Sequence, residues 1–240
     1  ELGDGLKFFF TRNSDFKGIK YFSLGNWGAR TGKRQKICGD GASTNKMNQV
    51  LSNNNGKFYE FGHHLSHAAN AFYTSSLDRS LIVTIDGGGW EDNSLRTAFT
   101  IFDGVGNKIH KIKVFPISEV NLGGIWHDLT KYVFGLSVGY PSGDQAGTVM
   151  SMASLGKAKY TDLLVNYQDN LQKLKLIAQK SEKEKFNVAA SLQAYTETTF
   201  KRIVSKYVSG RSNLCVSGGV SLNCVMLGKV KSWFPEIKNI

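Results

Sequence analysis

The sequence lacks several features that would assign a protein to a common class at once. It contains no apolar run of about 18 residues, so no segment is predicted to span a membrane. No signal-peptide pattern opens the chain. Cysteine is scarce, since the three residues Cys38, Cys215 and Cys224 are odd in number and show no Cys-x-x-Cys spacing. They indicate a reducing compartment rather than a disulfide framework, and we expect a cytoplasmic protein.

Acidic residues are also in deficit. The chain has 30 Lys and Arg residues against 19 Asp and Glu residues, a formal net charge of +11. Such an excess can favour nucleic acid or another anionic partner. The basic residues are scattered, however, and no dense basic tract with interleaved aromatic residues is present. This distribution argues against nucleic acid and favours a solvated surface that attracts phosphate-bearing small molecules.

The ends of the chain suggest a piece of a longer protein. The first residue is Glu1 rather than methionine, and residues 236–240 have the pattern of a strand that has only begun. We therefore expect any targeting signal or partner domain to lie outside the sequence. The 240 residues suffice for one large domain or two half-domains around a hydrophobic core.

Three of the five histidines fall within five positions, at His63, His64 and His67. On a helix, positions i and i+4 share a face, so His63 and His67 can point at a common atom. An apolar strand at 81–85 then ends at Asp86, whose carboxylate could supply a third ligand. Two imidazoles and one carboxylate suit a divalent metal with open positions, Fe(II) foremost. The glutamate of a zincin helix is absent, and both histidines could instead be ordinary capping or packing residues.

Glycines follow this carboxylate directly. Gly87, Gly88 and Gly89 come after Asp86, and residues without a Cβ allow the backbone to approach a ligand closely, as phosphate loops require. Gly87 and Gly88 are therefore candidates for contact with a nucleotide.

A second glycine pair, Gly218 and Gly219, separates a predicted strand at 213–217 from a helix predicted to run from Val220 to Trp233. Such a junction presents free backbone N–H groups and the positive end of the helix dipole to an anion. The two glycines, Val220 and Asn223 are thus candidate nucleotide contacts, and the Asn223 amide can hydrogen-bond a nucleotide. Alternatively, the glycine pair merely makes a close turn.

Alternating apolar residues predict the strands. Segments 80–86, 96–102 and 108–115 read as consecutive antiparallel strands with a turn at 103–106, and 213–217 should lie parallel to the first. An acidic residue on the first of three antiparallel strands is similar to the opening of a ribonuclease-H-like, actin-like nucleotide-binding half. The fold class is therefore predicted as α/β of this type.

Segments outside the sheet are assigned from helical spacing and from turn residues. The charged and uneven stretch 157–185 is interpreted as a peripheral helical insertion. The remaining predictions are short strands at 19–25 and 57–61, loops at 26–56 and 139–147, and helices at 125–136, 148–153 and 189–208.

Four motifs, at 63–73, 84–87, 149–153 and 215–224, occur in an order that resembles the O-carbamoyltransferases of nodulation and of cephamycin and aminoglycoside tailoring. The amino-terminal domain of that family is similar to the tRNA threonylcarbamoyl-adenosine transferase, an actin-like ATPase fold. The resemblance implies that residues 1–79, with the histidine helix, complete a first actin-like lobe. It also implies that residues 80–240 form a truncated second lobe.

The resemblance further implies that His63, His67 and Asp86 bind iron, and that Gly218, Gly219 and Asn223 contact ATP or a carbamoyl-adenylate. The adenylate would be made from carbamoyl phosphate and ATP, and the acceptor would be a hydroxyl of a small molecule or sugar. A separate adenylate-forming domain is expected beyond the carboxyl end. This fragment is expected to be inactive without it.

The motifs also depart from the family pattern. Thr148 and Ser151 stand where the family usually has a lysine and a glycine, and the loop at 143–147 differs as well. His64 is a candidate for moving the proton of the acceptor hydroxyl, its alternative being a buried structural imidazole. Two other functions stay open: a nucleotide- and metal-binding module without catalysis, and a tRNA threonylcarbamoyl transferase-like protein.

Overall fold

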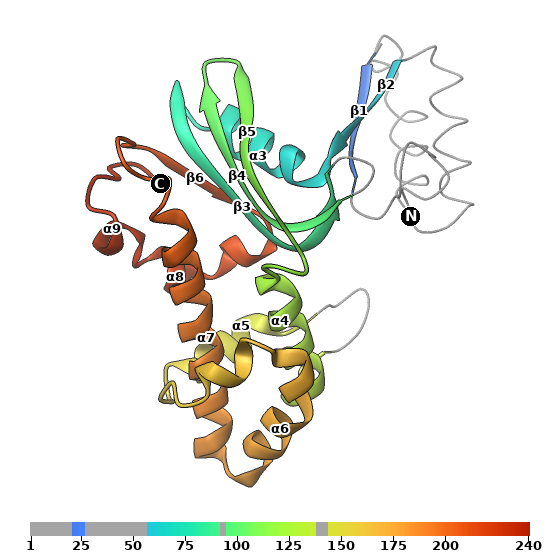
Figure 1. Ribbon diagram of the computed structural model, residues 1–240, viewed down its shortest axis with the longest axis vertical. Coiled ribbons are helices and arrows are strands. Elements are labelled where there is room, and N and C mark those ends of the chain that lie inside the picture. Colours follow the sequence, from blue (N-terminus) through green and yellow to red (C-terminus); the bar gives the residue numbers. More distant parts are fainter. Residues whose placement is uncertain (1–20, 27–56, 92–94, 138–143) are drawn as a thin grey trace, which may run out of the picture.

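The computed structural model describes residues 21–26, 57–91, 95–137 and 144–240. These residues form a mixed α/β structure. A four-stranded sheet occupies the upper half of the molecule in Figure 1, and helices occupy the lower half. None of the helices in these ranges is long and apolar enough to cross a membrane.

The sheet has the strand order β5-β4-β3-β6. Strands β3 (Arg79–Trp90), β4 (Arg96–Val105) and β5 (Lys108–Pro116) pair antiparallel, and β6 (Leu214–Ser217) runs parallel to β3. These pairings confirm the predicted sheet. The central strand β3 is buried from Ser80 to Ile85 because both of its faces are covered, which explains its continuous apolar run.

Two predicted strand ends were wrong. Strand β3 does not stop at Asp86 but continues to Trp90, with a register shift between Ile85 and Gly89 where it pairs with β4. Glycine is tolerated at such an irregularity because the bulged backbone adopts conformations closed to other residues. The predicted turn at 103–106 is mostly strand. The chain reverses at Gly106, which has φ +56°.

Strands β1 (Tyr21–Asn26) and β2 (Lys57–Gly62) form a separate parallel pair. They confirm the strand predicted at 57–61 and most of that at 19–25; residues 19–20 and the loop from 27 to 56 lie outside the described residues. Strand β2 leads directly into α3 (His63–Thr74), the predicted histidine helix.

Helix α3 covers one face of the sheet and α7 (Glu182–Val204) the other. Ala68 and Phe72 of α3 pack with Ile82 and Phe102. On the opposite face, Phe200 packs with other residues of β3 and β4, its ring centroid 6.4 Å from that of Phe99. The histidine helix therefore packs on the sheet of the predicted second lobe, while the predicted division of the chain into lobes stays a prediction.

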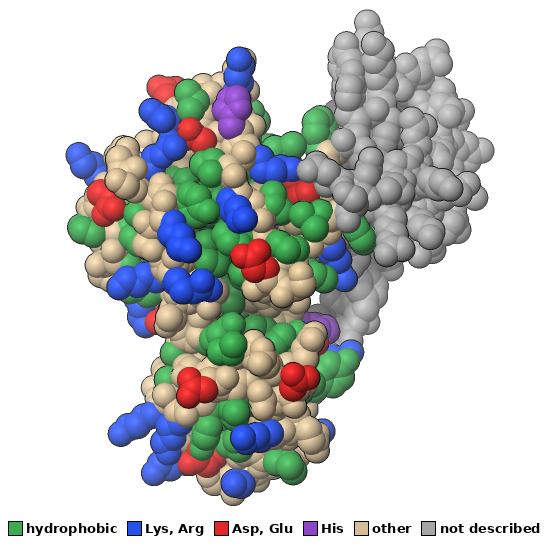
Figure 2. All heavy atoms as spheres, viewed as in Figure 1, with side chains coloured by type: hydrophobic (Ala, Val, Ile, Leu, Met, Phe, Trp, Pro, Cys, Tyr) green, Lys and Arg blue, Asp and Glu red, His purple; other side chains and the backbone are tan. Residues whose placement is uncertain are grey.

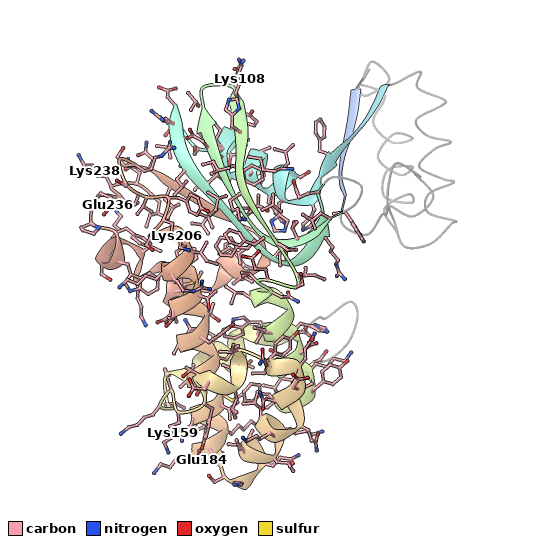
Figure 3. The ribbon with its side chains drawn as sticks, viewed as in Figure 1. Lys108, Lys159, Glu184, Lys206, Glu236 and Lys238 are labelled. Carbon is pink, nitrogen blue, oxygen red and sulfur yellow. The ribbon has the colours of Figure 1, made fainter. Side chains whose placement is uncertain are left out.

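In the lower half of Figure 1, a further group of helices packs around a second hydrophobic core. The stretch 157–185 is helical as predicted, and despite its charge it contributes the fully buried Leu164 and Leu174 to this core; that it is an insertion stays a prediction. The many lysines of this stretch made it look solvent-exposed in the sequence. One of them, Lys159, lies near the lower end of Figure 3, with its ammonium group 3.5 Å from the Glu184 carboxylate. The elements are α4 (Leu122–Asp128), the π-helical turn η3 (Leu129–Val133), α5 (Ala146–Ala153), the 3-10 turn η4 (Thr161–Leu164) and α6 (Tyr167–Lys180).

The helix predicted from Val220 to Trp233 is broken into three short pieces: η5 (Gly219–Leu222), α8 (Cys224–Leu227) and α9 (Val230–Trp233). The break follows from Asn223, which has non-helical backbone angles and caps α8 with its side chain. The strand predicted at 236–240 is present as a single bridge between Asn239 and Asn213, alongside β6.

Candidate metal centre and pocket

Helix α3 and strand β3 bring three side chains together, namely His63, His67 and Asp86. The two histidines lie on one face of α3, and their Nε2 atoms are 2.8 and 2.9 Å from the same carboxylate oxygen, Oδ2 of Asp86. The Nε2 atoms are 3.2 Å from each other. The three residues predicted from the sequence therefore converge on one point.

The geometry of this cluster fits a metal ion. Ligand atoms at about 2.1 Å from an ion, and at right angles to one another, are about 3.0 Å apart. The three separations between His63 Nε2, His67 Nε2 and Asp86 Oδ2 lie between 2.8 and 3.2 Å. Two imidazoles and one carboxylate are also the donor set of an iron or zinc site with open positions.

Asp86 is held in its ionised form. Burial alone would raise the pKa of this carboxyl, but hydrogen bonds from His63, His67 and the Gly87 N–H outweigh burial and hold the pKa well below its usual range. The Gly87 N–H donates to Oδ1 over 2.7 Å, while Oδ2 faces the two histidines. The two carboxylate oxygens therefore serve different partners.

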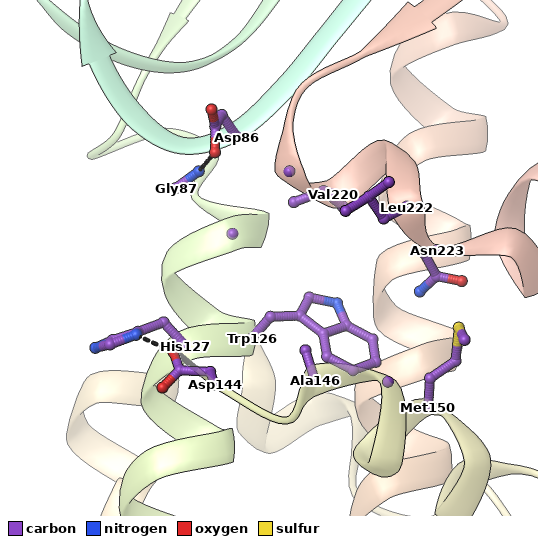
Figure 4. Close-up of a pocket in the computed structure, with 13 residues that line it drawn as sticks. Asp86, Gly87, Trp126, His127, Asp144, Ala146, Met150, Val220, Leu222 and Asn223 are labelled. Atoms are coloured by element: carbon purple, nitrogen blue, oxygen red, sulfur yellow. Dashed lines mark hydrogen bonds and ion pairs between the residues drawn. The ribbon is translucent and has the colours of Figure 1, made fainter. Parts of the chain in front are cut away.

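A pocket of about 460 Å³ opens beside Asp86. In Figure 4, Asp86 and Gly87 lie above it, Val220 and Leu222 to one side, and the Trp126 indole across its middle. The indole N–H donates to the Thr196 hydroxyl over 2.9 Å, which fixes the ring. Two carboxylates stand among largely apolar lining residues, Asp86 at the upper end of the pocket and Asp144 at the lower end.

The glycines predicted to contact a nucleotide divide into two groups. Gly87 and Gly219 line the pocket, and a Cβ added to Gly219 would lie 3.1 Å from Asp86 Oδ1. Gly218 has φ +96°, and a Cβ there would lie 2.2 Å from the Ile85 carbonyl oxygen. Gly88, with φ +128°, packs against Arg96 and another side chain and does not line the pocket. Gly88 and Gly218 are thus required by the backbone conformation and by close packing at their positions.

Asn223 and Val220 both line the pocket. The Asn223 side chain is already engaged, since its amide pairs reciprocally with Gln193 and its oxygen accepts from the Met226 N–H. The predicted long helix with an anion-binding N-terminus is absent, because Gly219 begins only a four-residue 3-10 turn. A nucleotide here would meet the Gly219 backbone rather than a helix dipole.

His64 points away from this site. It is fully buried and does not line the pocket. Its Nε2–H donates to the Thr97 carbonyl oxygen over 3.0 Å, so its Nδ1 accepts from the Thr84 hydroxyl over 2.7 Å. Burial lowers the pKa of this imidazole to about 4. The arrangement favours the structural alternative for His64 over proton transfer.

Sequence reasoning missed the lower half of the pocket. Trp126 and Met150 come from α4 and α5, and His127 forms an ion pair with Asp144 beside them. Hydrogen bonds from Ser137 and His127 overcome the effect of burial and lower the pKa of Asp144. The departure of this loop from the family pattern was the one signal that pointed here.

Comparisons with known proteins bear on the family of the chain, and the family model reaches only the pocket residues that follow β6. Residues 165–235 match the family model described as the carbamoyltransferase N-terminus. The chain is 30% identical over 190 residues to nodulation protein NolNO of Sinorhizobium fredii, covering 70% of this chain and 26% of that protein. The resemblance to the carbamoyltransferase family is confirmed.

Other similar proteins add to this. An uncharacterised protein of Synechocystis, sll1178, is 29% identical over 207 residues, which cover 70% of this chain and 31% of the relative. The crystal structure of HypF from T. kodakarensis superposes with a TM-score of 0.52 at 11% identity, over 83% of this chain and 36% of HypF, and supports the mixed α/β fold alone. The chain thus spans less than a third of the length of either of these relatives.

Proposed function

We propose that the protein transfers a carbamoyl group from a carbamoyl-adenylate, made from carbamoyl phosphate and ATP, to a hydroxyl of a small-molecule or sugar acceptor. The observation that carries this proposal is the double position of Asp86, which joins the histidine cluster and also lines the pocket. The carbamoyltransferase relatives supply the class of reaction. The ribonuclease-H-like, actin-like topology belongs to the same proposal, supported by the order and direction of β3 to β6.

His63, His67 and Asp86 would hold Fe(II) or another divalent ion. Such an ion supplies Lewis acidity, which stabilises negative charge that grows on a carbonyl or phosphate oxygen. The negative charge of Asp86 supports the presence of a metal ion. An ionised carboxylate beside the pocket repels a phosphate unless a cation compensates its charge. Nucleotide binding next to Gly219 therefore depends on the metal.

The chain's own residues would bind and orient the reactants. The fixed Trp126 indole offers a flat apolar surface to a base or an acceptor, and the Val220 and Leu222 side chains line the pocket opposite it. The Gly219 backbone leaves room beside Asp86 for a phosphate group.

The distribution of charge favours a small-molecule substrate over tRNA. On the face shown in Figure 2, Lys and Arg side chains are dispersed among acidic and apolar ones over both halves of the molecule. Recognition of tRNA calls for a concentrated basic surface. The alternative to this function is a nucleotide- and metal-binding module without catalysis of its own.

Metal content and turnover test the proposal. In the intact protein, His67→Ala should lose bound metal and carbamoyl transfer, because it removes one of three ligands. His110→Ala is the matched control, since His110 is an exposed imidazole on β5, and it should keep both. A folded His67→Ala protein with its full metal content would show that the cluster is ordinary helix packing.

Turnover separates the two functions. With ATP, carbamoyl phosphate and a panel of hydroxyl acceptors, the wild-type protein should form a carbamate ester. If the metal and ATP bind but the intact protein transfers nothing, the binding-module alternative holds instead.

A further inference from the structure

Glu91 is a buried carboxylate for which the proposed reaction has no use. It follows the last residue of β3, and its side chain is only 1% exposed. Removing a carboxylate from water costs several kcal/mol unless the protein supplies partners for it. The partners of Glu91 therefore indicate why it is there.

The partners lie in the first turn of α3. Oε1 of Glu91 accepts from the backbone N–H groups of His64 and of Leu65, the latter over 3.1 Å. The other carboxylate oxygen, Oε2, lies 3.2 Å from the Lys111 ammonium group of β5. One carboxylate thus ties the start of the histidine helix to the sheet.

Helix α3 provides no such group itself. Its N-cap residue is Gly62, which has no side chain to accept a hydrogen bond, and its first turn contains no acidic residue. The first N–H groups of a helix need acceptors and attract negative charge. Glu91, 26 positions beyond Leu65 in the sequence, satisfies both requirements.

Two glycines make this contact possible. A Cβ at Gly62 would lie 2.8 Å from Oε2 of Glu91, and a Cβ at Gly89 would lie 2.1 Å from Cγ of His63. Helix α3 and the end of β3 therefore approach more closely than side chains at these positions would allow.

From these contacts we propose that Glu91 is a positioning residue that fixes where α3 lies along β3. The chain at β3 holds the helix at two points: Asp86 contacts the side chains of His63 and His67, and Glu91, directly after the strand, contacts the backbone between these two histidines. A shift of the helix start would move both Nε2 atoms relative to Asp86. The consequence for metal affinity rests on the proposed function, whereas the capping of α3 does not.

Three variants of the intact protein test this role. Glu91→Ala removes the acceptor, Glu91→Gln keeps an acceptor oxygen without the charge, and Glu236→Ala removes an exposed carboxylate near the C-terminal end (Figure 3). The measurements are amide hydrogen exchange at His64 and Leu65 and affinity for Co²⁺ as a spectroscopic probe. Loss of a residue that supports metal ligands typically weakens affinity about 10- to 100-fold.

Glu91→Ala should exchange these two amides at least about tenfold faster, as expected when a charged hydrogen bond is lost, and should bind Co²⁺ more weakly. Glu91→Gln should recover most of the protection, and Glu236→Ala should match the wild type. If Glu91→Ala does not fold, the Gln variant decides, because partial loss confined to these two amides is still expected.

Unchanged exchange at both amides in a folded Glu91→Ala protein would overturn the proposal. So would faster exchange spread evenly over the whole chain with unchanged Co²⁺ affinity, which would make Glu91 a general stabilising residue. If the wild-type protein itself binds no Co²⁺, Fe²⁺ or Zn²⁺, the proposed metal centre fails, and the exchange measurement still decides the capping role of Glu91.

Discussion

His64 has either a structural role or a catalytic one, and the variant His64→Ala decides between the two. The imidazole is fully buried and makes two hydrogen bonds, to the Thr84 hydroxyl and the Thr97 carbonyl. A structural role predicts a large loss of stability. A role in proton transfer predicts a loss of turnover in a protein that stays stable.

The loss of stability can be worked from these contacts. Without the imidazole, the buried Thr97 carbonyl loses the hydrogen bond that His64 donates to it, which costs about 1–3 kcal/mol. The Thr84 hydroxyl can turn its one proton to the Thr100 carbonyl oxygen, 3.4 Å away, so its share of the cost is smaller. The cavity left by the ring adds to this cost. We expect a decrease in the free energy of unfolding of about 3–5 kcal/mol in total.

Urea unfolding followed by circular dichroism measures this difference, and turnover should be normalised to the folded fraction at the assay temperature. We expect transfer per folded molecule to stay within a few-fold of wild type. An unfolding free energy within about 0.5 kcal/mol of wild type would refute the structural role, because exposed positions typically show changes of that size. If such a stable variant had also lost transfer, His64 would be catalytic.

Three further predictions concern the pocket, the turn beside it and the helical half. Gly219→Val should weaken ATP binding to the intact protein without unfolding it, because its side chain would stand beside Asp86 Oδ1; unchanged affinity would make the turn purely structural. Gly218→Ala should instead destabilise the fold, because of its positive φ and the nearby Ile85 carbonyl. Burial and the hydrogen bond to Asp128 raise the pKa of Tyr167 to about 12 from 10.0. The folded state therefore holds this proton more tightly, so stability should fall more steeply between pH 10 and 12 in the wild type than in Tyr167→Phe; equal pH profiles would contradict the shift.

The sequence was informative where the structural signal is local. His63 and His67 share a helix face because four residues make about one turn, and the apolar strand before Asp86 has a length and composition that few other elements share. The three antiparallel strands follow from alternation and from turn residues between them. Each of these predictions needed only about a dozen neighbouring residues.

Predictions failed where distant segments decide the structure. Strand β3 continues through Gly87 to Gly89 because β4 pairs with it beyond the bulge, and no pattern in the glycines themselves shows this. The segment 157–185 looks solvated in sequence, yet Leu164 and Leu174 meet apolar residues of α4, α5 and α7. The pocket likewise combines α4 and α5 with the turn after β6, residues about 100 positions apart in the numbering.

The cluster of His63, His67 and Asp86 shows both kinds of information in one place. Its ligands could be found by spacing, but spacing does not set their distances to within a few tenths of an ångström. That depends on Glu91, which accepts from the start of α3, and on Gly62 and Gly89, which let the helix and strand approach. A metal centre needs ligands held this closely, because a shift of about 1 Å in one ligand breaks its bond to the ion. The residues that set the geometry of the cluster therefore include some that lie outside its three side chains, and a search for candidate ligands alone does not find them.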